Sequence, residues 1–149
     1  MDKIELKLCD IQGRLFVKSA EKKYSSDKFI KSYMNSAVAK GLDSRYNRLQ
    51  WAGEEYILEE IEDEVTLQRD GEIWQTDILF WIGYIYRYWH FYTGENSKQI
   101  YGMASAKTMR RNYMMFHTMD PKMAVDDLKE IYYQKHPGYS RGKTAPTPK

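Results

Sequence analysis

The chain has 149 residues, a formal net charge of +2 and one cysteine, Cys9. This length fits one domain with a proper core, the small net charge does not by itself indicate nucleic acid or a membrane as a partner, and a single cysteine excludes an intrachain disulfide framework. Charged residues interrupt the first eight positions, where a secretory signal would need an apolar run. We therefore expect a soluble cytoplasmic protein that is not inserted in a membrane.

Two helices are predicted in the N-terminal part of the chain. Apolar side chains recur there every three or four positions, which predicts an amphipathic helix over about residues 3–22. Ser25 or Ser26 can cap a second helix, which we expect to end by Gly41.

The longest predicted helix starts after Asp43 and runs over about residues 44–65. Its apolar positions follow steps of three and four residues, and its opposite face is acidic. The acidic residues are Glu54, Glu55, Glu59, Glu60, Glu62, Asp63 and Glu64. Such a run is typical of a solvated helix face. The functional alternative is a docking surface for a basic partner, with contacts from Glu55, Glu59 and Glu62.

A helix over residues 77–92 is apolar or aromatic on nearly every side. A helix of this kind is normally buried, so we place it at the centre of the fold. Gly83 would let a neighbouring helix approach closely, and Gly94 is suited to end the helix in a left-handed turn.

Arg87 and His90 are the clearly polar residues of this central helix. A buried arginine stays charged and must be paired or hydrogen-bonded. One interpretation is a core arginine that ties helices together through a carboxylate, for example from the acidic helix. A second is an anion site in which Arg87, His90 and tyrosine hydroxyls hold a phosphate or carboxylate. A third is a partner-binding surface that adds Tyr88 and Tyr92 to these two residues.

The chain after the central helix predicts three more helices and a tail. The first helix is short, about 97–103, the second begins after Ser105, and the third starts at Asp120-Pro121 and stops at residue 136. Residues 137–149 are rich in Gly, Pro, Ser, Thr and Lys, which predicts a disordered tail. The predicted organisation is a single all-α domain, residues 1–136, of about six helices around a buried, aromatic-rich central helix.

The segment over residues 97–113 has the order of a helix-turn-helix, with a short helix, a turn and a second helix that carries cationic side chains. Recognition helices present Lys, Arg, Thr and Asn to phosphates and base edges. This order gives a DNA-binding alternative that would use Lys107, Arg110 and Arg111. The turn lacks the usual glycine, which favours an ordinary helical hairpin.

The stretch Arg111-Asn-Tyr-Met-Met-Phe-His117 resembles the arginine, polar residue, spacer and histidine motif of the HEPN ribonuclease superfamily, which is also all-helical. The resemblance implies a metal-independent ribonuclease in which Arg111, Asn112 and His117 act on RNA across the interface of a homodimer. In that family the motif starts a long helix, whereas Asp120-Pro121 interrupts this one.

No pattern in the sequence predicts a metal site or a cofactor. The histidines His90, His117 and His136 do not have the spacing of a ligand set, and there is no glycine-rich phosphate loop. Cys9 has no histidine or basic activator nearby in the sequence, so we interpret it as a small core residue.

The C-terminal half, about residues 81–132, carries four short motifs in a fixed order. They are Trp81-x-Gly-Tyr-x-Tyr-Arg-Tyr-Trp, Asn96-Ser-Lys-Gln-Ile-Tyr, Asn112-Tyr-x-x-Phe-His-Thr118 and an Ala-Val-x-Asp-Leu helix. This order is similar to that of small uncharacterised bacterial all-helical domains, common in gut Firmicutes, whose Tyr-x-x-Leu-His-Thr signature has Phe116 at the leucine position here. Some members are encoded beside ADP-ribosyltransferase-type toxins, which implies an antitoxin or accessory role.

The sequence therefore favours a non-enzymatic bacterial interaction protein, the antitoxin-like or accessory member of a two-gene module. Its partner would be a cognate toxin or another neighbouring gene product, bound by the acidic face or by the surface around Arg87, since arginine and aromatic side chains commonly anchor such interfaces. The HEPN-like ribonuclease is the enzymatic alternative and the helix-turn-helix DNA binder is the third, so nucleic acid and a second copy of the chain stay open as partners.

Overall fold

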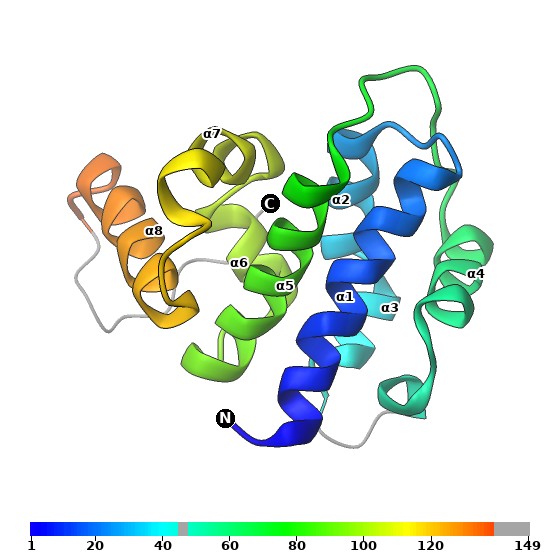
Figure 1. The fold of residues 1–149 in the computed structure, drawn as a ribbon, viewed down its shortest axis with the longest axis horizontal. Coiled ribbons are helices and arrows are strands. Elements are labelled where there is room, and N and C mark those ends of the chain that lie inside the picture. The colour runs from blue at the N-terminus through cyan, green and yellow to red at the C-terminus, as the bar shows by residue number, and fades with distance from the viewer. Residues whose placement is uncertain (45–47, 139–149) are drawn as a thin grey trace.

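The computed structural model describes residues 1–44 and 48–138, and these residues form an all-α fold (Figure 1). They comprise the helices α1 (Lys3–Glu21), α2 (Ser26–Met34), α3 (Ala37–Leu42), α4 (Glu54–Glu64), α5 (Thr76–Thr93), α6 (Ser97–Met103), α7 (Ala106–Phe116) and α8 (Pro121–Lys135), with a short 3₁₀-helix, η1 (Arg48–Trp51). The all-α prediction is confirmed, although the described residues form eight α-helices where the sequence predicts about six. Most of the predicted tail, from residue 139 onward, lies outside the described residues.

Helices α1 and α5 lie side by side and make the most extensive helix–helix contact among the described elements (Figure 1). An added Cβ atom at Gly83 of α5 would lie 2.5 Å from the carbonyl oxygen of Gln12 in α1. Conversely, an added Cβ atom at Gly13 would lie 2.8 Å from the ring of Phe80. Only glycine permits backbones to come this close. The predicted close approach of a neighbouring helix at Gly83 is therefore confirmed.

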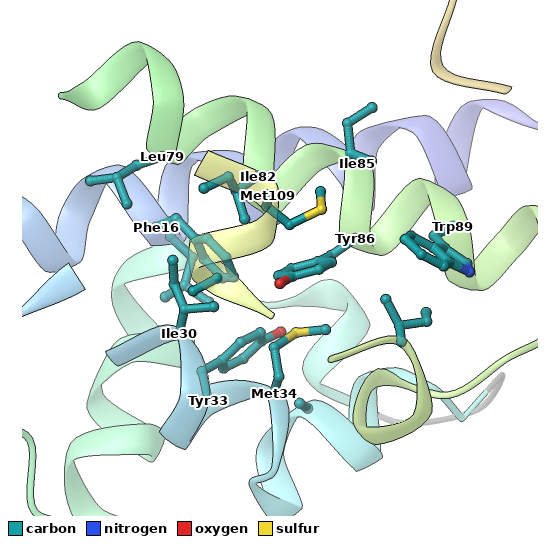
Figure 2. Close-up of a cluster of buried hydrophobic side chains, with 14 of the residues drawn as sticks. Phe16, Ile30, Tyr33, Met34, Leu79, Ile82, Ile85, Tyr86, Trp89 and Met109 are labelled. Carbon is teal, nitrogen blue, oxygen red and sulfur yellow. The ribbon is translucent and has the colours of Figure 1, made fainter. Parts of the chain in front are cut away.

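One face of α5 points into the hydrophobic core, which also takes side chains from α1, α2 and α7 (Figure 2). Two buried aromatic residues of α5 have partners for their polar atoms. The Tyr86 hydroxyl donates to the carbonyl oxygen of Ala104 at 2.6 Å, and the Trp89 indole nitrogen donates to Glu95 Oε1 at 3.0 Å. Because these polar atoms are hydrogen-bonded, large aromatic side chains can be buried without an unpaired donor.

Two predictions for the N-terminal half differ from the observed elements. The second predicted helix is split into α2 and α3, because the Ser36 hydroxyl accepts a hydrogen bond from the Ala39 amide and starts a new helix. The predicted helix over residues 44–65 is wrong in its first half. There the described residues form η1, and α4 begins only after Gly53, whose extended backbone is typical of an N-cap. Residues 45–47 of that predicted helix lie outside the described residues.

The C-terminal half follows the predicted boundaries closely. Asn96, Ser105 and Asp120 cap α6, α7 and α8, each by accepting a hydrogen bond from a backbone amide of the first turn. Helix α5 ends at Gly94, whose φ of 81° lies in the left-handed region. Across residues 1–44 and 48–138, no helix combines the length and the hydropathy that crossing a membrane requires.

Candidate functional site

Arg87 is buried in the fold, with 2% of its surface exposed. Its Nη1 atom donates to Asp43 Oδ1 at 2.7 Å, and its Nε and Nη2 atoms donate to Gln12 Oε1 at 3.1 and 2.9 Å. Nη2 also lies 3.3 Å from the Ser97 hydroxyl. These contacts favour the core-arginine interpretation. The sequence suggested the acidic helix as one example of where the partner carboxylate could come from. In the structure that carboxylate comes instead from Asp43, directly after α3.

Gln12 holds this network together from α1. Its Nε2 atom donates to the carbonyl oxygen of Gly83 at 2.8 Å, and its Oε1 atom also accepts from the Tyr33 hydroxyl at 2.6 Å. Burial raises the pKa of Tyr33 to about 12, so its hydroxyl stays protonated and remains a donor. The buried polar groups are therefore paired with one another, which ties α1, α2, α5 and the segment after α3 together.

Asp43 and His90 extend the network toward the surface. Asp43 Oδ2 accepts from the Ser97 backbone amide at 2.9 Å, and Asp43 Oδ1 lies 3.7 Å from His90 Nδ1. His90 Nδ1 lies 2.7 Å from the carbonyl oxygen of Glu95, and because a carbonyl only accepts, Nδ1 carries the proton. Burial, followed by the positive charge of Arg87, lowers the pKa of His90 below its ordinary value, so the imidazole is neutral near pH 7.

A groove of about 400 Å³ opens beside Asp43 and His90. Its walls come from the first turns of α1, from the end of α5 and from η1, and its lining includes Ile4, Glu5, Asp43, Trp51, His90 and Phe91. Trp51 is 76% exposed, although an indole of this size is usually covered. We call this feature the Trp51 groove. Asp43 and His90 belong both to the floor of this groove and to the buried Arg87 network, and the rim carries the exposed Trp51 side chain.

The rim of the Trp51 groove is acidic. Asp2 and Glu5 form a capping box at the start of α1, in which the Asp2 carboxylate accepts from the Glu5 amide at 2.8 Å and the Glu5 carboxylate accepts from the Asp2 amide at 3.1 Å. Neither carboxylate has a recorded ion pair with a described residue, and none of the described lining residues is a lysine or arginine. Arg87 lies behind Asp43 and is already paired.

The residues predicted as one partner-binding surface on α5 separate in the structure. Arg87 is internal and His90 faces the Trp51 groove. Tyr88 and Tyr92 lie on another side of the helix, with ring centroids 6.4 Å apart. The Tyr92 hydroxyl donates to Asp126 of α8 at 2.8 Å, and the Tyr92 side chain remains exposed on the surface.

The acidic residues of α4 are partly neutralised by α1. Glu54 lies 3.3 Å from Arg14, Glu55 lies 3.5 Å from Lys18, and Glu62 lies 3.1 Å from Lys22. The Tyr24 hydroxyl also donates to Glu62, and this bond, as the largest cause, lowers the pKa of the Glu62 carboxyl. Of the three predicted contact residues, Glu59 is exposed without a recorded ion pair in the described part of the chain. Three of the seven predicted acidic residues therefore form ion pairs with cations of α1.

The residues of the DNA-binding alternative line a second groove, of about 520 Å³, which we call the Arg110 groove. Arg110 donates two hydrogen bonds to Glu72, at 3.0 and 2.8 Å, and its guanidinium lies 4.8 Å from the ring centre of Trp74. Lys107 lies 3.7 Å from Asp27. Arg111 lines the same groove and has no recorded ion pair with a described residue. Most of the cationic charge here is already matched by carboxylates.

Two of the three side chains of the ribonuclease alternative are hydrogen-bonded to the backbone of their own helix. The Asn112 amide donates to the carbonyl oxygen of Thr108 at 2.8 Å, and His117 Nδ1 lies 2.8 Å from the carbonyl oxygen of Tyr113. Both bonds lie within α7 or its last turn, and Arg111 is exposed. No recorded hydrogen bond or ion pair joins two of these three candidate side chains in the described structure.

Two other kinds of chemistry find little support among the described residues. Cys9 is buried, and burial raises the pKa of its thiol to about 12, so it is not a thiolate near pH 7. No group of three or more His, Cys, Asp and Glu side chains among residues 1–44 and 48–138 could hold a metal ion.

Sequence reasoning found Arg87 and His90 but missed the residues that complete the site. The position of Gln12 indicates a buried polar side chain. Gln12 lies four positions after Leu8 and three before Leu15, and it therefore falls on the apolar face of its helix. At Asp43 the sequence predicts a helix start, and nothing local marks Trp51 as exposed. No protein-family model, curated protein or solved structure matches the chain.

Proposed function

We propose that the chain is a non-enzymatic interaction protein whose protein partner binds in the Trp51 groove. The observation that carries this proposal is the 76% exposure of Trp51 on the rim of a groove of about 400 Å³. Tryptophan is the side chain most often found at the energetic centre of protein interfaces, and an uncovered apolar patch beside a concave surface is typical of a binding site.

The floor of the groove supports this proposal because it is held in place before any partner arrives. Asp43 is fixed by Arg87 and Ser97, and His90 is fixed by the Glu95 carbonyl. A site that is already ordered loses less conformational entropy on binding. The described lining of the groove has no serine, threonine, cysteine or lysine that could act as a nucleophile beside the His90 imidazole, which is why we propose binding and not catalysis.

The nature of the partner is proposed from the resemblance of the C-terminal half to domains encoded beside ADP-ribosyltransferase-type toxins. We propose that the chain is the antitoxin-like member of such a bacterial two-gene module and acts in the cytoplasm. The bundle, organised around α5, would then serve as the scaffold that presents the Trp51 groove to the toxin or another neighbouring gene product.

Co-expression with the neighbouring gene product tests the proposal. The neighbour alone should arrest growth of the host, and co-expression of this chain should restore growth and yield a complex of fixed stoichiometry on gel filtration. Trp51→Ala should abolish both effects. Met114→Ala is the matched control, because Met114 is 78% exposed on α7 and lies outside the groove.

Other outcomes would overturn the proposal. Recovery of the chain with RNA and without a protein would favour the ribonuclease alternative, in which Arg111→Ala and His117→Ala should abolish RNA cleavage. Recovery with DNA, bound in a strongly salt-dependent way, would favour the DNA-binding alternative. A complex that Trp51→Ala leaves intact would keep the interaction protein but remove the groove as its site.

A further inference from the structure

We propose that the Trp51 groove accepts a segment of a protein partner in which a lysine or arginine is flanked by apolar residues. This proposal rests on the proposed function and names the chemistry that the same site recognises. In this arrangement the cationic group lies over the indole of Trp51 and faces Asp2 and Glu5, while an apolar neighbour packs against Ile4 and Phe91 of the groove wall.

The charged side chains that line the groove, within the described part of the chain, are of one sign. Asp2, Glu5 and Asp43 are acidic, and His90 is neutral near pH 7 because burial lowers its pKa. The start of α1 carries roughly half a positive charge and the end of α5 roughly half a negative charge, so the two helix dipoles largely offset each other at the groove. The carboxylates of Asp2 and Glu5, which have no recorded ion pair with a described residue, therefore set the sign of the field at the rim, and that sign favours a cation.

The groove also has an exposed apolar part. Ile4 is 49% exposed and Trp51 is 76% exposed, and both lie on the lining of the same concave surface. The face of an indole attracts a cation held within about 6 Å of the ring centre. A lone metal ion or a small ammonium would use only the acidic rim and would leave this apolar surface uncovered, whereas a peptide segment covers both.

The Arg110 groove contains the same residue types, but there the chain itself supplies the cations that face the tryptophan and the carboxylates. There Arg110 is already over Trp74, and Trp74 is only 4% exposed. Each of Lys28, Lys107 and Arg110 faces a carboxylate of the chain itself. Among the described residues, the Trp51 groove has the aromatic face and the carboxylates but no lysine or arginine, and we infer that a partner supplies the cation.

Three labelled peptides of equal length test this inference by fluorescence anisotropy. One alternates arginine and leucine, one alternates glutamate and leucine, and one alternates arginine and serine. We expect the arginine–leucine peptide to bind roughly tenfold more tightly than either of the others, since only it satisfies both the charge and the apolar surface. Binding should weaken as salt is raised.

The variants can be chosen so that the fold is kept. Asp2→Asn and Glu5→Gln remove the charges but preserve the capping box, because asparagine is a good N-cap and glutamine can close the box. We expect the double variant and Trp51→Ala each to weaken arginine–leucine binding roughly tenfold. Glu59→Gln is the matched control, because it removes an exposed carboxylate of α4 outside the groove, and it should leave the affinity unchanged.

Equal binding of the three peptides, or an equal loss on Glu59→Gln, would overturn the inference by showing non-specific attraction to acidic surface. Gel filtration of the chain alone is part of the test. A dimer that Trp51→Ala dissociates would make a second copy of this chain the occupant and would also overturn the inference. If the partner from the co-expression experiment is lost on Trp51→Ala but kept by the Asp2→Asn, Glu5→Gln variant, the cationic segment is excluded and the proposed function stands.

Discussion

The Trp51 groove and the Arg110 groove contain the same kinds of residue in two different states. In the Arg110 groove, the tryptophan is buried under an arginine and the cationic side chains of Lys28, Lys107 and Arg110 face carboxylates. In the Trp51 groove, the tryptophan is exposed and the rim carboxylates have no recorded cationic partner among the described residues. A site that has satisfied its own charges stabilises the fold, whereas a site that has not is available to a partner.

The largest expected effect comes from the floor of the Trp51 groove. Arg87→Met should lower the free energy of unfolding by about 3–5 kcal/mol, because it leaves Asp43 charged and buried without its partner. Urea unfolding followed by circular dichroism measures this loss. Arg111→Met is the control, since Arg111 is exposed on α7, and it should change stability by less than about 0.5 kcal/mol. A loss below about 1 kcal/mol for Arg87→Met would contradict the structural role given to the network.

A smaller effect is expected where α1 meets α5. Gly83→Ala should destabilise the fold by about 1–3 kcal/mol, because the new methyl group would lie 2.5 Å from the carbonyl oxygen of Gln12 and push α1 away. Since α1 carries Asp2 and Glu5, this variant should also weaken binding in the Trp51 groove but leave the Arg110 groove intact. Gly138→Ala, which would meet no atom within 4 Å, provides the comparison in the same urea titration.

His90 should make stability depend on pH in a narrow window. Its pKa is lowered in the folded state, first by burial and then by Arg87, so below its ordinary value of 6.5 the unfolded chain binds a proton that the folded chain binds less readily. Stability should therefore fall as pH drops below about 6.5 toward the folded pKa. His90→Asn should flatten this part of the profile in urea unfolding at several pH values.

The titration of the Glu62 carboxyl provides a control at lower pH in the same profile of stability against pH. The pKa of the Glu62 carboxyl is lowered from 4.5, chiefly by the hydrogen bond from Tyr24, so its stabilising contribution is lost only as pH falls below that value. His90→Asn should leave this acidic part of the profile unchanged. A profile that His90→Asn does not alter above pH 5 would contradict the burial assigned to the imidazole.

The smallest effect on stability is expected for Trp51. Trp51→Ala should change the free energy of unfolding by less than about 0.5 kcal/mol, because the side chain is mostly exposed. In the unmodified chain, the fluorescence of Trp51 should instead report the charge of the groove, with the ratio of caesium to iodide quenching higher than the same ratio for free tryptophan. Asp2→Asn with Glu5→Gln should lower this ratio, and a ratio below that of free tryptophan would contradict an acidic rim.

The sequence predicted most strongly where a local signal sets the structure. Gly94 and the caps at Ser105 and Asp120 act within one helical turn, so each could be placed from neighbouring residues alone. The predicted helix over residues 44–65 was too long because its periodicity continues through a segment where Gly53 starts a separate helix. Local patterns therefore predicted where helices end better than they predicted whether a long helix continues without a break.

The site was only half predictable for a related reason. Arg87 is conspicuous because a charge inside an apolar helix needs a partner wherever the chain folds. The identity of that partner depends on tertiary contacts, and Asp43 lies 44 positions away in the sequence. The exposure of Trp51 is likewise a property of the packed fold, because the same tryptophan in another packing would be a core residue.

Gln12 sets a limit on how this sequence can vary. One oxygen of its amide accepts from the Tyr33 hydroxyl and from two nitrogens of Arg87, and its nitrogen donates to the Gly83 carbonyl. Glutamate would lose the donor, leucine would lose both functions, and asparagine would be one methylene too short. We therefore expect the fold to tolerate many residues at position 51, whereas position 12 should require glutamine for as long as Arg87 is kept.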